Sequence, residues 1–378
     1  MPRIADPCVL QLCHGYDGPF LDCARQYAVL FKCTPYRVIT VFLTGSPSEE
    51  VKNGCASDEV LFLNYRSRDL RGLKLAAIRE LKQIVRRHNT SFIIAHRFKP
   101  TCIALIASEL PVIGVNHAFG VYSRLSRRLF ANCYRRRLCL LGISMAVTDD
   151  LRASLPGWPA ERIETLYNRI DVKAVQSEQL DRDAARAALG LPMDAWVVGN
   201  AGRLHADKDQ ATLVRGFALA LPRLPERSLL AIMGSGPLET SLKQMAADQG
   251  VADRVRFLGQ IPHGRRYFKA FDVFALTSDH EPFGMVLLEA MAAGVPVICS
   301  DCGGGREVVE GVGGLFPLGD IRSLAGRLVD TLDLSMSSVS ENRESILQVL
   351  SEKFSDEAAR KRFWSLRSVS GFKDERFR

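Results

Sequence analysis

Two glutamates eight residues apart, Glu281 and Glu289, lie in a segment that combines a turn with an apolar helix. Pro282 and Gly284 precede the apolar run, so we expect a short helix to begin there. The N–H groups of its first turn have no partner within the helix and would suit a phosphate. Glu289 lies inside the apolar run, where a carboxylate needs hydrogen-bond donors, and sugar hydroxyls supply them. The alternative is that Glu289 emerges on a polar stripe of the helix.

A second group of residues has the composition of an anion site. Small residues from Gly199 to Gly202 are followed by Arg203 and, five residues later, by Lys208. Glycines let a backbone approach an anion, and the two cations supply charge for phosphate oxygens. The chain contains no GxxxxGK[ST] motif, so this segment is not a P-loop. A tight turn with solvated cations is the alternative for this segment taken alone.

Other catalytic patterns are missing from the sequence. No pair of carboxylates has the arrangement of a retaining hydrolase, and no cluster of metal-ligand residues occurs. We therefore expect neither a metal nor another cofactor. Cys299 and Cys302 form a CxxC without a second Cys or His pair nearby, which favours a reduced structural pair at a strand end over a zinc or redox site. Ten scattered cysteines indicate the cytoplasm.

Positive charge is concentrated in the first half of the chain. Residues 1–180 contain 25 Lys+Arg against 16 Asp+Glu, whereas the whole chain has 50 against 42. Within this half, the segment from Arg124 to Arg137 carries six arginines among Leu, Phe and Tyr. Basic amphipathic segments dock on anionic membranes or hold phosphorylated acceptors. We expect an anionic glycan or lipid-linked acceptor and peripheral contact with the inner membrane through this segment; a solvated basic face is the alternative.

Size and composition describe a globular chain. Its 378 residues are enough for two domains, and its hydrophobic content of 47% with 24% charged residues is ordinary for a folded protein. No apolar stretch approaches the ~20 residues of a membrane-spanning helix. Residues 1–6 lead into no long apolar region, so we expect no secretory signal and a cytoplasmic location.

The alternation of strand-like and helix-like segments predicts an α/β fold. In the second half we expect strands at 195–202, 228–233, 255–258, 273–276 and 296–300, helices at 209–221, 238–249 and 283–293, and a helical turn at 265–270. In the first half we expect strands at 9–13, 36–43, 60–63, 92–95, 112–115 and 139–146. Residues 171–192 read as a connection with one short helix, and an amphipathic helix follows Ser355. Parallel sheets built in this way bind ligands at the carboxyl ends of their strands.

Taken together, these motifs resemble the family-4 retaining glycosyltransferases with the GT-B fold. The resemblance is strongest over 167–320 and rests on Arg203, Lys208, Glu281, Glu289, Gly294–Val297 and Gly303–Glu307. Over 1–166 it is looser and rests on Gly15–Gly18, His117, Ser144 and the segment Tyr167–Asp171. Two departures concern glycines. The family usually has Gly at the position of Arg169, and it often has paired glycines in the first loop, where Tyr16 and Asp17 separate Gly15 from Gly18.

This resemblance implies two doubly wound Rossmann-like domains that face each other across a cleft. We expect residues 1–172 to form the acceptor-binding domain and residues 173–353 to form the nucleotide-sugar-binding domain. Residues 354–378 should form a helix that crosses back onto the N-terminal domain.

The resemblance also implies roles for single residues. Arg203 and Lys208 would neutralise the diphosphate of a nucleotide sugar, and Glu281 would hydrogen-bond the transferred sugar. Glu289 would accept both ribose hydroxyls, and His117 would face the cleft and contact the sugar or developing positive charge. Together with these, the residues expected to bind the donor are Gly18, Gly202, Gly234, Gly259, Phe283, Gly284 and Glu289. Sugar transfer would occur from the front face with retention, and Lys208→Ala should cut its rate while leaving the fold intact.

The expected function is transfer of a sugar from a nucleotide-sugar donor to a glycan or lipid-linked acceptor, in lipopolysaccharide core or surface polysaccharide synthesis. One alternative is a sugar-nucleotide epimerase on the same fold. Another is a catalytically inactive sugar-nucleotide sensor or assembly subunit. A phosphorylase would need a lysine for pyridoxal phosphate in its own motif, which is missing. We expect no nucleic-acid partner, because the basic half has no aromatic platform or recognised module.

Overall fold

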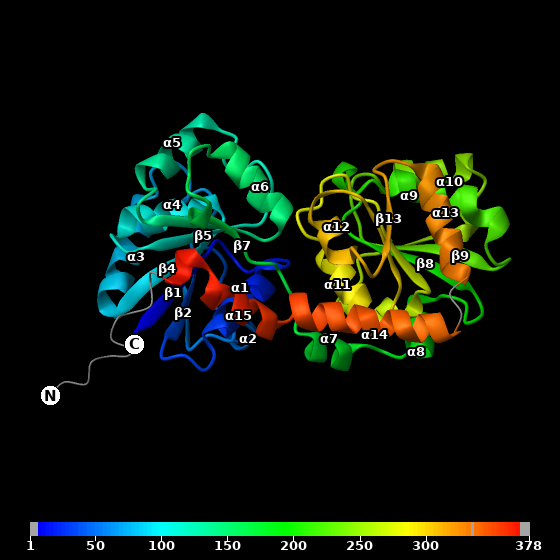
Figure 1. Ribbon diagram of the computed structural model, residues 1–378, viewed down its shortest axis with the longest axis horizontal. Helices are drawn as coiled ribbons and strands as arrows, with labels where there is room; N and C mark the ends of the chain where they lie inside the picture. The colour runs from blue at the N-terminus through cyan, green and yellow to red at the C-terminus, as the bar shows by residue number, and fades with distance from the viewer. Residues whose placement is uncertain (1–6, 334–335, 371–378) are drawn as a thin grey trace. The chain divides into compact units, whose positions relative to one another are not determined.

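In the computed structural model, which describes residues 7–333 and 336–370, the chain divides into two compact units (Figure 1). The first unit consists of Met1–Asn168 and Asp356–Arg378, and the second consists of Arg169–Ser355. From the sequence we expected these two boundaries after residues 172 and 353. The chain therefore passes out of the first unit and returns to it near its end.

Seven parallel strands form the sheet of the first unit, in the order β3-β2-β1-β4-β5-β6-β7. Their bounds are Cys8–Cys13 (β1), Arg37–Phe42 (β2), Glu59–Phe62 (β3), Thr90–His96 (β4), Val112–Asn116 (β5), Leu138–Gly142 (β6) and Ile163–Thr165 (β7). Strands β1, β5 and β6 are buried at every position, as parallel strands covered on both faces should be. The strand order reverses between β1 and β4, and such a switch point is where an open parallel sheet binds ligands.

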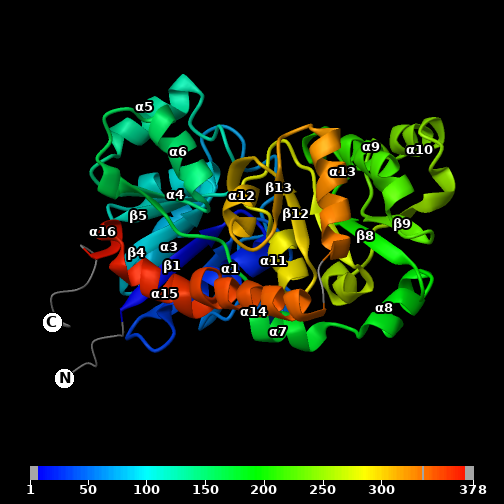
Figure 2. The ribbon, with the colours of Figure 1, turned by 45° about the vertical axis from the view of Figure 1, so that its right-hand side comes forward.

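The helices of the first unit come from both parts of its chain. They are Phe20–Ala28 (α1), Glu49–Gly54 (α2), Leu75–Arg87 (α3), Phe98–Ala107 (α4), Leu125–Cys133 (α5), Met145–Ser154 (α6), Asp356–Ser365 (α15) and Arg367–Ser370 (α16). Figures 1 and 2 show α15 and α16 in red, beside elements coloured blue and cyan. In α15, the Trp364 indole N–H donates to the Leu30 carbonyl at 3.0 Å, and the Phe363 ring lies 5.6 Å from that of Phe31. The returning segment is thus part of the first hydrophobic core.

The second unit contains a six-stranded parallel sheet in the order β10-β9-β8-β11-β12-β13. The strands are Trp196–Ala201 (β8), Ser228–Met233 (β9), Val255–Gly259 (β10), Val273–Leu276 (β11), Val297–Ser300 (β12) and Gly314–Phe316 (β13). The strand order reverses between β8 and β11. Both units are therefore doubly wound, as predicted.

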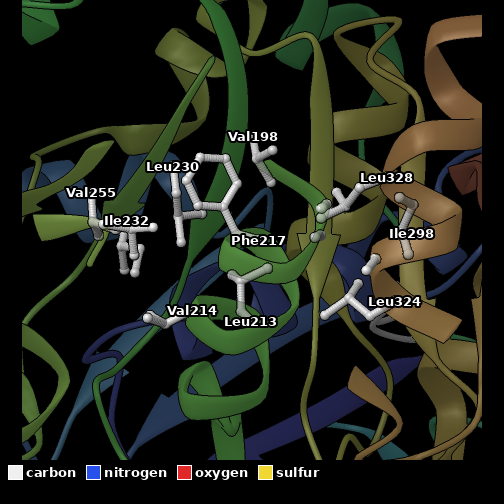
Figure 3. Close-up of a cluster of buried hydrophobic side chains, with 14 of the residues drawn as sticks. Val198, Leu213, Val214, Phe217, Leu230, Ile232, Val255, Ile298, Leu324 and Leu328 are labelled. Atoms are coloured by element: carbon white, nitrogen blue, oxygen red, sulfur yellow. The ribbon is translucent and has the colours of Figure 1, made fainter. Parts of the chain in front are cut away.

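Eight helices described in the second unit connect and cover these strands. They are Val172–Glu178 (α7), Arg182–Leu189 (α8), Gln210–Ala220 (α9), Glu239–Asp248 (α10), Met285–Ala292 (α11), Gly303–Val309 (α12), Ile321–Asp330 (α13) and Met336–Lys353 (α14). Figure 3 shows Leu213 and Phe217 of α9, together with Leu324 of α13, packed beside Val198 and Leu230 of the sheet. Full burial of such side chains stabilises the fold by about 1.5–3 kcal/mol each. This core fixes the strand ends that carry the candidate site.

Most predicted elements match the structure, and two differ. The expected strand 139–146 ends as β6 at Gly142, and α6 begins at Met145. The apolar run continues through both elements, but the Ser144 hydroxyl accepts the Val147 N–H and caps a new helix. The expected connection at 171–192 forms two helices rather than one, α7 and α8, because Asp171 and Asp181 each cap a helix start.

Candidate functional site

A cavity of about 520 Å³ lies at the carboxyl ends of β8, β9 and β10 in the second unit. Backbone that leaves these strands forms much of its wall, and Glu289 contributes from α11. The residues that line it are Ala201, Gly202, Arg203, Met233, Gly234, Ser235, Gln260, Ile261, His263, Gly264, Arg265, Phe268 and Glu289. The cavity therefore occupies the edge of the sheet where ligands of this architecture bind.

Three predicted glycines meet at this edge. The Gly202 N–H donates to the Met233 carbonyl at 2.9 Å, and the Gly234 N–H donates to the Gly259 carbonyl at 2.7 Å. Gly234 has a φ of +132°, and a Cβ there would lie 1.9 Å from the Gly202 oxygen. Only glycine fits such an approach, which leaves the cavity wall as bare backbone.

The second feature of the candidate site is an ion pair between Lys208 and Glu281. Lys208 Nζ is 2.7 Å from Glu281 Oε2, and the two side chains are 18% and 9% exposed. The Ser278 hydroxyl donates to the same carboxylate oxygen at 3.2 Å, and the Phe283 N–H donates to Oε1 at 3.4 Å. Both carboxylate oxygens therefore have donors, which a charge at this depth requires.

Backbone contacts hold the loop that carries Lys208. The Thr277 hydroxyl, just after β11, donates to the carbonyls of Lys208 at 3.1 Å and Asp209 at 2.9 Å. The Asp279 N–H donates to the Asp207 carbonyl at 3.1 Å. The loop after β8 is thus fastened to the loop after β11, and the ion pair joins the same two loops.

Arg203 extends from this loop toward solvent at the wall of the cavity. Its side chain is 71% exposed, and its Nη2 lies 3.3 Å from Asp207 Oδ2. His205 Nδ1 forms a hydrogen bond with the other oxygen of Asp207. Burial raises the pKa of Asp207, but the His205 hydrogen bond and the charges of Lys208 and Arg203 outweigh it, and the pKa stays below its usual value. Asp207 is therefore ionised at neutral pH and pairs with Arg203.

Helix α11 places Glu289 in the cavity wall. The helix begins after Gly284, whose φ is +96°, and Glu289 is half-buried. The Phe283 ring belongs to the hydrophobic core, where it lies 5.7 Å from the ring of Phe354. At the start of α12, the Gly304 N–H donates to the Glu281 carbonyl at 2.8 Å. Contacts at both ends of the turn thus fix the segment that contains the two glutamates.

Two predicted site residues, His117 and Gly18, belong to the first unit. His117 Nε2 lies 3.2 Å from His96 Nδ1, and its Nδ1 lies 4.0 Å from Cys23 Sγ. Burial, with the positive charge of Arg97, lowers the pKa of His117 to about 4, so the imidazole is neutral at pH 7. Gly18 is exposed in the turn before α1. The structure therefore brings together Arg203, Lys208, Glu281, Glu289 and the glycines of the second unit, whereas His117 and Gly18 lie in the first.

Several residues of the cavity wall were not predicted. Gln260, His263, Arg265 and Phe268 follow β10. Both Glu178 carboxylate oxygens accept hydrogen bonds from Arg265, at 2.8 and 2.9 Å, so α7 steadies this side of the wall. In the sequence, only their position after the carboxyl end of a parallel strand could have indicated these residues.

The six arginines between Arg124 and Arg137 do not form one uniform face. Arg137 donates to the carbonyls of Leu105 at 2.9 Å and Ser108 at 2.6 Å, and therefore ties α4 and the loop after it to the start of β6. Exposed apolar side chains, Leu125 and Leu129, stand one turn apart on α5. No helix among the described residues is long and apolar enough to cross a membrane.

Cysteines and other side chains that can bind metals are the next candidates for chemistry. Among residues 7–333 and 336–370, no three His, Cys, Asp or Glu side chains gather in a way that could hold a metal ion. Cys299 and Cys302 are free thiols, the first buried in β12 and the second just beyond it. The Cys302 thiol donates to the Ser278 carbonyl at 2.9 Å, next to the residue that supports Glu281.

Comparison with known families gives two adjacent matches. Residues 36–174 match the model of "Glycosyltransferase Family 4", and residues 181–345 match that of "Glycosyl transferases group 1". The two matches divide near the boundary between the units. Together they include the cavity, the Lys208–Glu281 pair and His117.

Individual proteins show the same likeness. An uncharacterised glycosyltransferase of Methanocaldococcus jannaschii is 30% identical over 203 residues, which cover 50% of each chain. The lipopolysaccharide core biosynthesis mannosyltransferase LpsB of Rhizobium meliloti is 36% identical over 150 residues, 39% of this chain and 42% of that protein. The chain thus matches about half or less of these relatives' length. The Anabaena HepE structure in complex with UDP is similar with a TM-score of 0.76 and 21% identity, covering 94% of this chain and 98% of the other.

Proposed function

The chain belongs to family 4 of the glycosyltransferases and has the GT-B fold, and we propose that it is a retaining enzyme that transfers a sugar from a nucleotide-sugar donor. The proposed acceptor is a glycan or a lipid-linked glycan of lipopolysaccharide core or surface polysaccharide synthesis. One observation carries the proposal: the cavity at the carboxyl ends of β8–β10 adjoins the loop that bears Arg203 and Lys208, and Lys208 pairs with Glu281 of the loop after β11.

The nucleoside part of the donor fits the chemistry of the cavity. Glu289 offers a carboxylate that can accept two ribose hydroxyls, and the bare backbone at Gly202 and Gly234 lets a flat base or phosphate approach closely. The complex of HepE with UDP supports a nucleotide ligand for a fold of this kind. Arg203, exposed at the cavity wall, is placed to meet the diphosphate.

The reaction needs stabilisation of a departing nucleoside diphosphate. In the proposed step, the bond between the anomeric carbon and the donor phosphate breaks, and the electron pair leaves with the phosphate. The acceptor hydroxyl oxygen bonds to the same face of that carbon, and its proton passes to the leaving phosphate oxygen. Arg203 and Lys208 offset the developing negative charge, and hydrogen bonds to the loop after β11 hold the backbone of their loop in place. Glu281, oriented by Ser278 and Lys208, accepts hydroxyl donors of the transferred sugar.

The charge on these residues allows the step to proceed without a metal ion. Two cations beside one site supply the positive charge that a divalent ion would otherwise provide. We therefore expect full activity in the presence of a chelator such as EDTA.

The basic segment on α5 supports peripheral contact with the cytoplasmic face of the inner membrane. Leu125 and Leu129 are exposed one turn apart, and Arg124 and Arg136 of the same segment are exposed as well. Apolar side chains among exposed cations suit an anionic lipid surface. Sedimentation with phosphatidylglycerol vesicles should fall in a Leu125→Ser/Leu129→Ser variant, and equal sedimentation of the two proteins would contradict this contact.

Nucleotide-dependent stabilisation tests the proposed function first. The midpoint of thermal unfolding is measured with UDP, GDP and ADP, since a ligand at 100 times its Kd adds about 2.7 kcal/mol to stability. We expect one nucleotide to raise the midpoint of the wild type and of Glu226→Gln, an exposed control in the same unit, but not of Glu289→Gln. If none of the three does so, the proposal fails.

Product analysis then tests the reaction itself. The nucleotide identified above is supplied as its sugar conjugate with a lipopolysaccharide core acceptor, and NMR of the product reports the anomeric configuration. Retention of the donor configuration is expected. Release of free nucleotide without a glycosylated acceptor would instead indicate an epimerase.

A further inference from the structure

The first unit contains a second cavity, of about 730 Å³, at the carboxyl end of its own sheet. Residues that follow β4 and β5 form most of its wall, with contributions from the loops after β1 and β3. The strand order reverses between β1 and β4 at this edge. By position, this cavity is therefore the counterpart of the one in the second unit.

Its wall carries positive charge and contains no carboxylate of its own. None of the residues that line it is Asp or Glu, whereas five are permanent cations: Arg71, Lys74, Arg97, Lys99 and Arg127. Among the described residues, none of these five forms an ion pair with a carboxylate. Elsewhere in this unit arginines such as Arg25 do pair, with Asp22 and Asp356. The cations of the cavity repel one another and lack the partner that an anion would supply.

The excess of positive charge also affects the pKa of Lys99. Burial lowers the pKa of Lys99, and the positive charges of Lys74, Arg71 and Arg97 lower it further. The same pattern reaches His14, another wall residue, whose pKa is lowered by burial and then by Lys99 and Arg97, against a weaker opposing effect of Asp17. A bound anion would offset the positive charges that lower the pKa of both residues.

Arg97 is held in the wall by an unusual backbone conformation. Its φ is +74° and its ψ is 163°, a region that residues other than glycine rarely adopt and that costs about 1–3 kcal/mol. Its N–H donates to the Val115 carbonyl at 2.9 Å, and its guanidinium lies 4.3 Å from the centre of the Phe20 ring. Arg97 is also the residue before α4, so the first-turn N–H groups of that helix begin beside it. Strain of this kind persists where function or surrounding structure requires it.

We propose that this cavity binds a phosphate group, held by Arg71, Lys74, Arg97 and Lys99, on the acceptor of the transfer reaction. That the phosphate belongs to an acceptor rests on the proposed function. The phosphate site itself rests on the cavity alone. Guanidinium groups bind phosphate through paired hydrogen bonds, and lysines add point charges. Phe20 and Phe98 in the same wall offer apolar surface to the group that carries the phosphate. The site is separate from the exposed side chains of α5 that we assign to the membrane.

A soluble sugar phosphate and a phosphate-bearing lipid test the assignment with one set of variants. Glucose 6-phosphate is titrated by calorimetry, with glucose as the neutral control, into the wild type, Lys74→Gln/Lys99→Gln and Arg86→Gln/Arg87→Gln. The last variant removes the same charge from exposed positions on α3 that do not line the cavity. Sedimentation with phosphatidic acid vesicles, against phosphatidylcholine vesicles, supplies the lipid arm.

We expect at least tenfold weaker binding of one phosphate probe by Lys74→Gln/Lys99→Gln, and wild-type binding by Arg86→Gln/Arg87→Gln. Loss of glucose 6-phosphate binding would assign a water-soluble phosphate, and loss confined to the vesicles would assign a lipid-borne one; either supports the site. If neither probe separates the two variants, the proposal is wrong. Unfolding midpoints without ligand verify that both variants fold.

The nucleotide-stabilisation assay keeps the two proposals apart. Lys74→Gln/Lys99→Gln should retain nucleotide-dependent stabilisation, and Glu289→Gln should retain phosphate binding. Nucleotide binding without a cation-dependent phosphate site would overturn this inference alone. A phosphate site in a protein that binds no nucleotide would overturn the proposed function and leave the cavity assignment standing.

Discussion

Lys208 Nζ lies 2.7 Å from Glu281 Oε2, so the two predicted catalytic side chains of opposite charge neutralise each other. The donor diphosphate and the transferred sugar would each compete for one partner of this pair. Lys208 is therefore both a charge for the phosphate and a support for Glu281. This dual role changes what a substitution should do.

Replacing Lys208 alone should lower stability as well as activity. In Lys208→Met the Glu281 carboxylate is left nearly buried without its cation, and breaking such a pair costs about 3 kcal/mol. Lys208→Met/Glu281→Gln removes both charges and should lie closer to the wild type in urea unfolding, although both variants should lose transfer activity. Lys208→Ala should likewise keep the fold, as expected from the sequence, but with a lower free energy of unfolding. Equal unfolding free energies for the single and double variants would contradict the supporting role of Lys208 toward Glu281.

Gly234→Ala should damage the cavity of the second unit. The new Cβ would lie 1.9 Å from the Gly202 oxygen, and the φ of +132° is unfavourable for alanine. Strain and overpacking each cost about 1–3 kcal/mol. The matched control is Gly264→Ala in the same cavity wall, where the closest atom, Met233 Cε, would be 3.9 Å away. Denaturant unfolding should separate the two variants clearly; similar losses would show that Gly234 is not sterically required.

The pair formed by half-buried His117 and buried His96 should make stability depend on pH. His117 has a pKa of about 4 in the folded chain, below its ordinary value of 6.5, and burial also lowers the pKa of His96. The unfolded chain therefore binds more protons between pH 6.5 and 4, so this contribution is complete above pH 6.5 and is lost as the pH falls toward 4. For His117 alone the loss amounts to about 3 kcal/mol.

His117→Asn isolates this effect from the titration of other groups. Asparagine keeps hydrogen-bonding capacity but carries no titrating group in this range. The difference in unfolding free energy between pH 7.5 and pH 4.5 should be smaller in the variant than in the wild type. An unchanged difference would mean that His117 does not titrate with a lowered pKa.

Arg186 of the second unit should be highly sensitive to substitution. It is fully buried, donates to the carbonyls of Ala270 and Ala195, and pairs with Asp272 at 2.8 Å. Arg186→Met leaves buried acceptors without donors and should cost about 3–5 kcal/mol. Arg182→Gln affects the same carboxylate from a half-exposed position and should cost less than about 1 kcal/mol. Equal costs in thermal unfolding would rule out this account.

The strand pattern was predictable because parallel strands in these units are continuous apolar runs bounded by turns. Strands 228–233 and 273–276 were predicted with the bounds of β9 and β11. An apolar run that contains a helix start is different. The segment 139–146 kept its hydrophobicity across the β6–α6 boundary, and only the capping hydroxyl of Ser144 marks the change. Apolar periodicity cannot resolve such a boundary over so few residues.

A site residue was predictable where its side chain is unusual for the segment that contains it. Glu289 was singled out because a carboxylate in an apolar helix needs donors, and it lines the cavity. Gln260 and Arg265 have no such conflict, since polar residues after a strand are ordinary. Arg97 and Lys99 were not predicted for a second reason. Their charge matters only because strands from separate parts of the chain bring five cations together around one cavity.

The return of the chain to the first unit sets an order of events during synthesis. Phe31 and Leu30 near the start of the chain find partners in Phe363 and Trp364, which the ribosome adds more than three hundred residues later. The second unit has all of its strands and helices before that point and can close while the first still lacks α15. The domain begun first is therefore the one completed last, and the apolar surface around Phe31 stays uncovered until α15 has been synthesised.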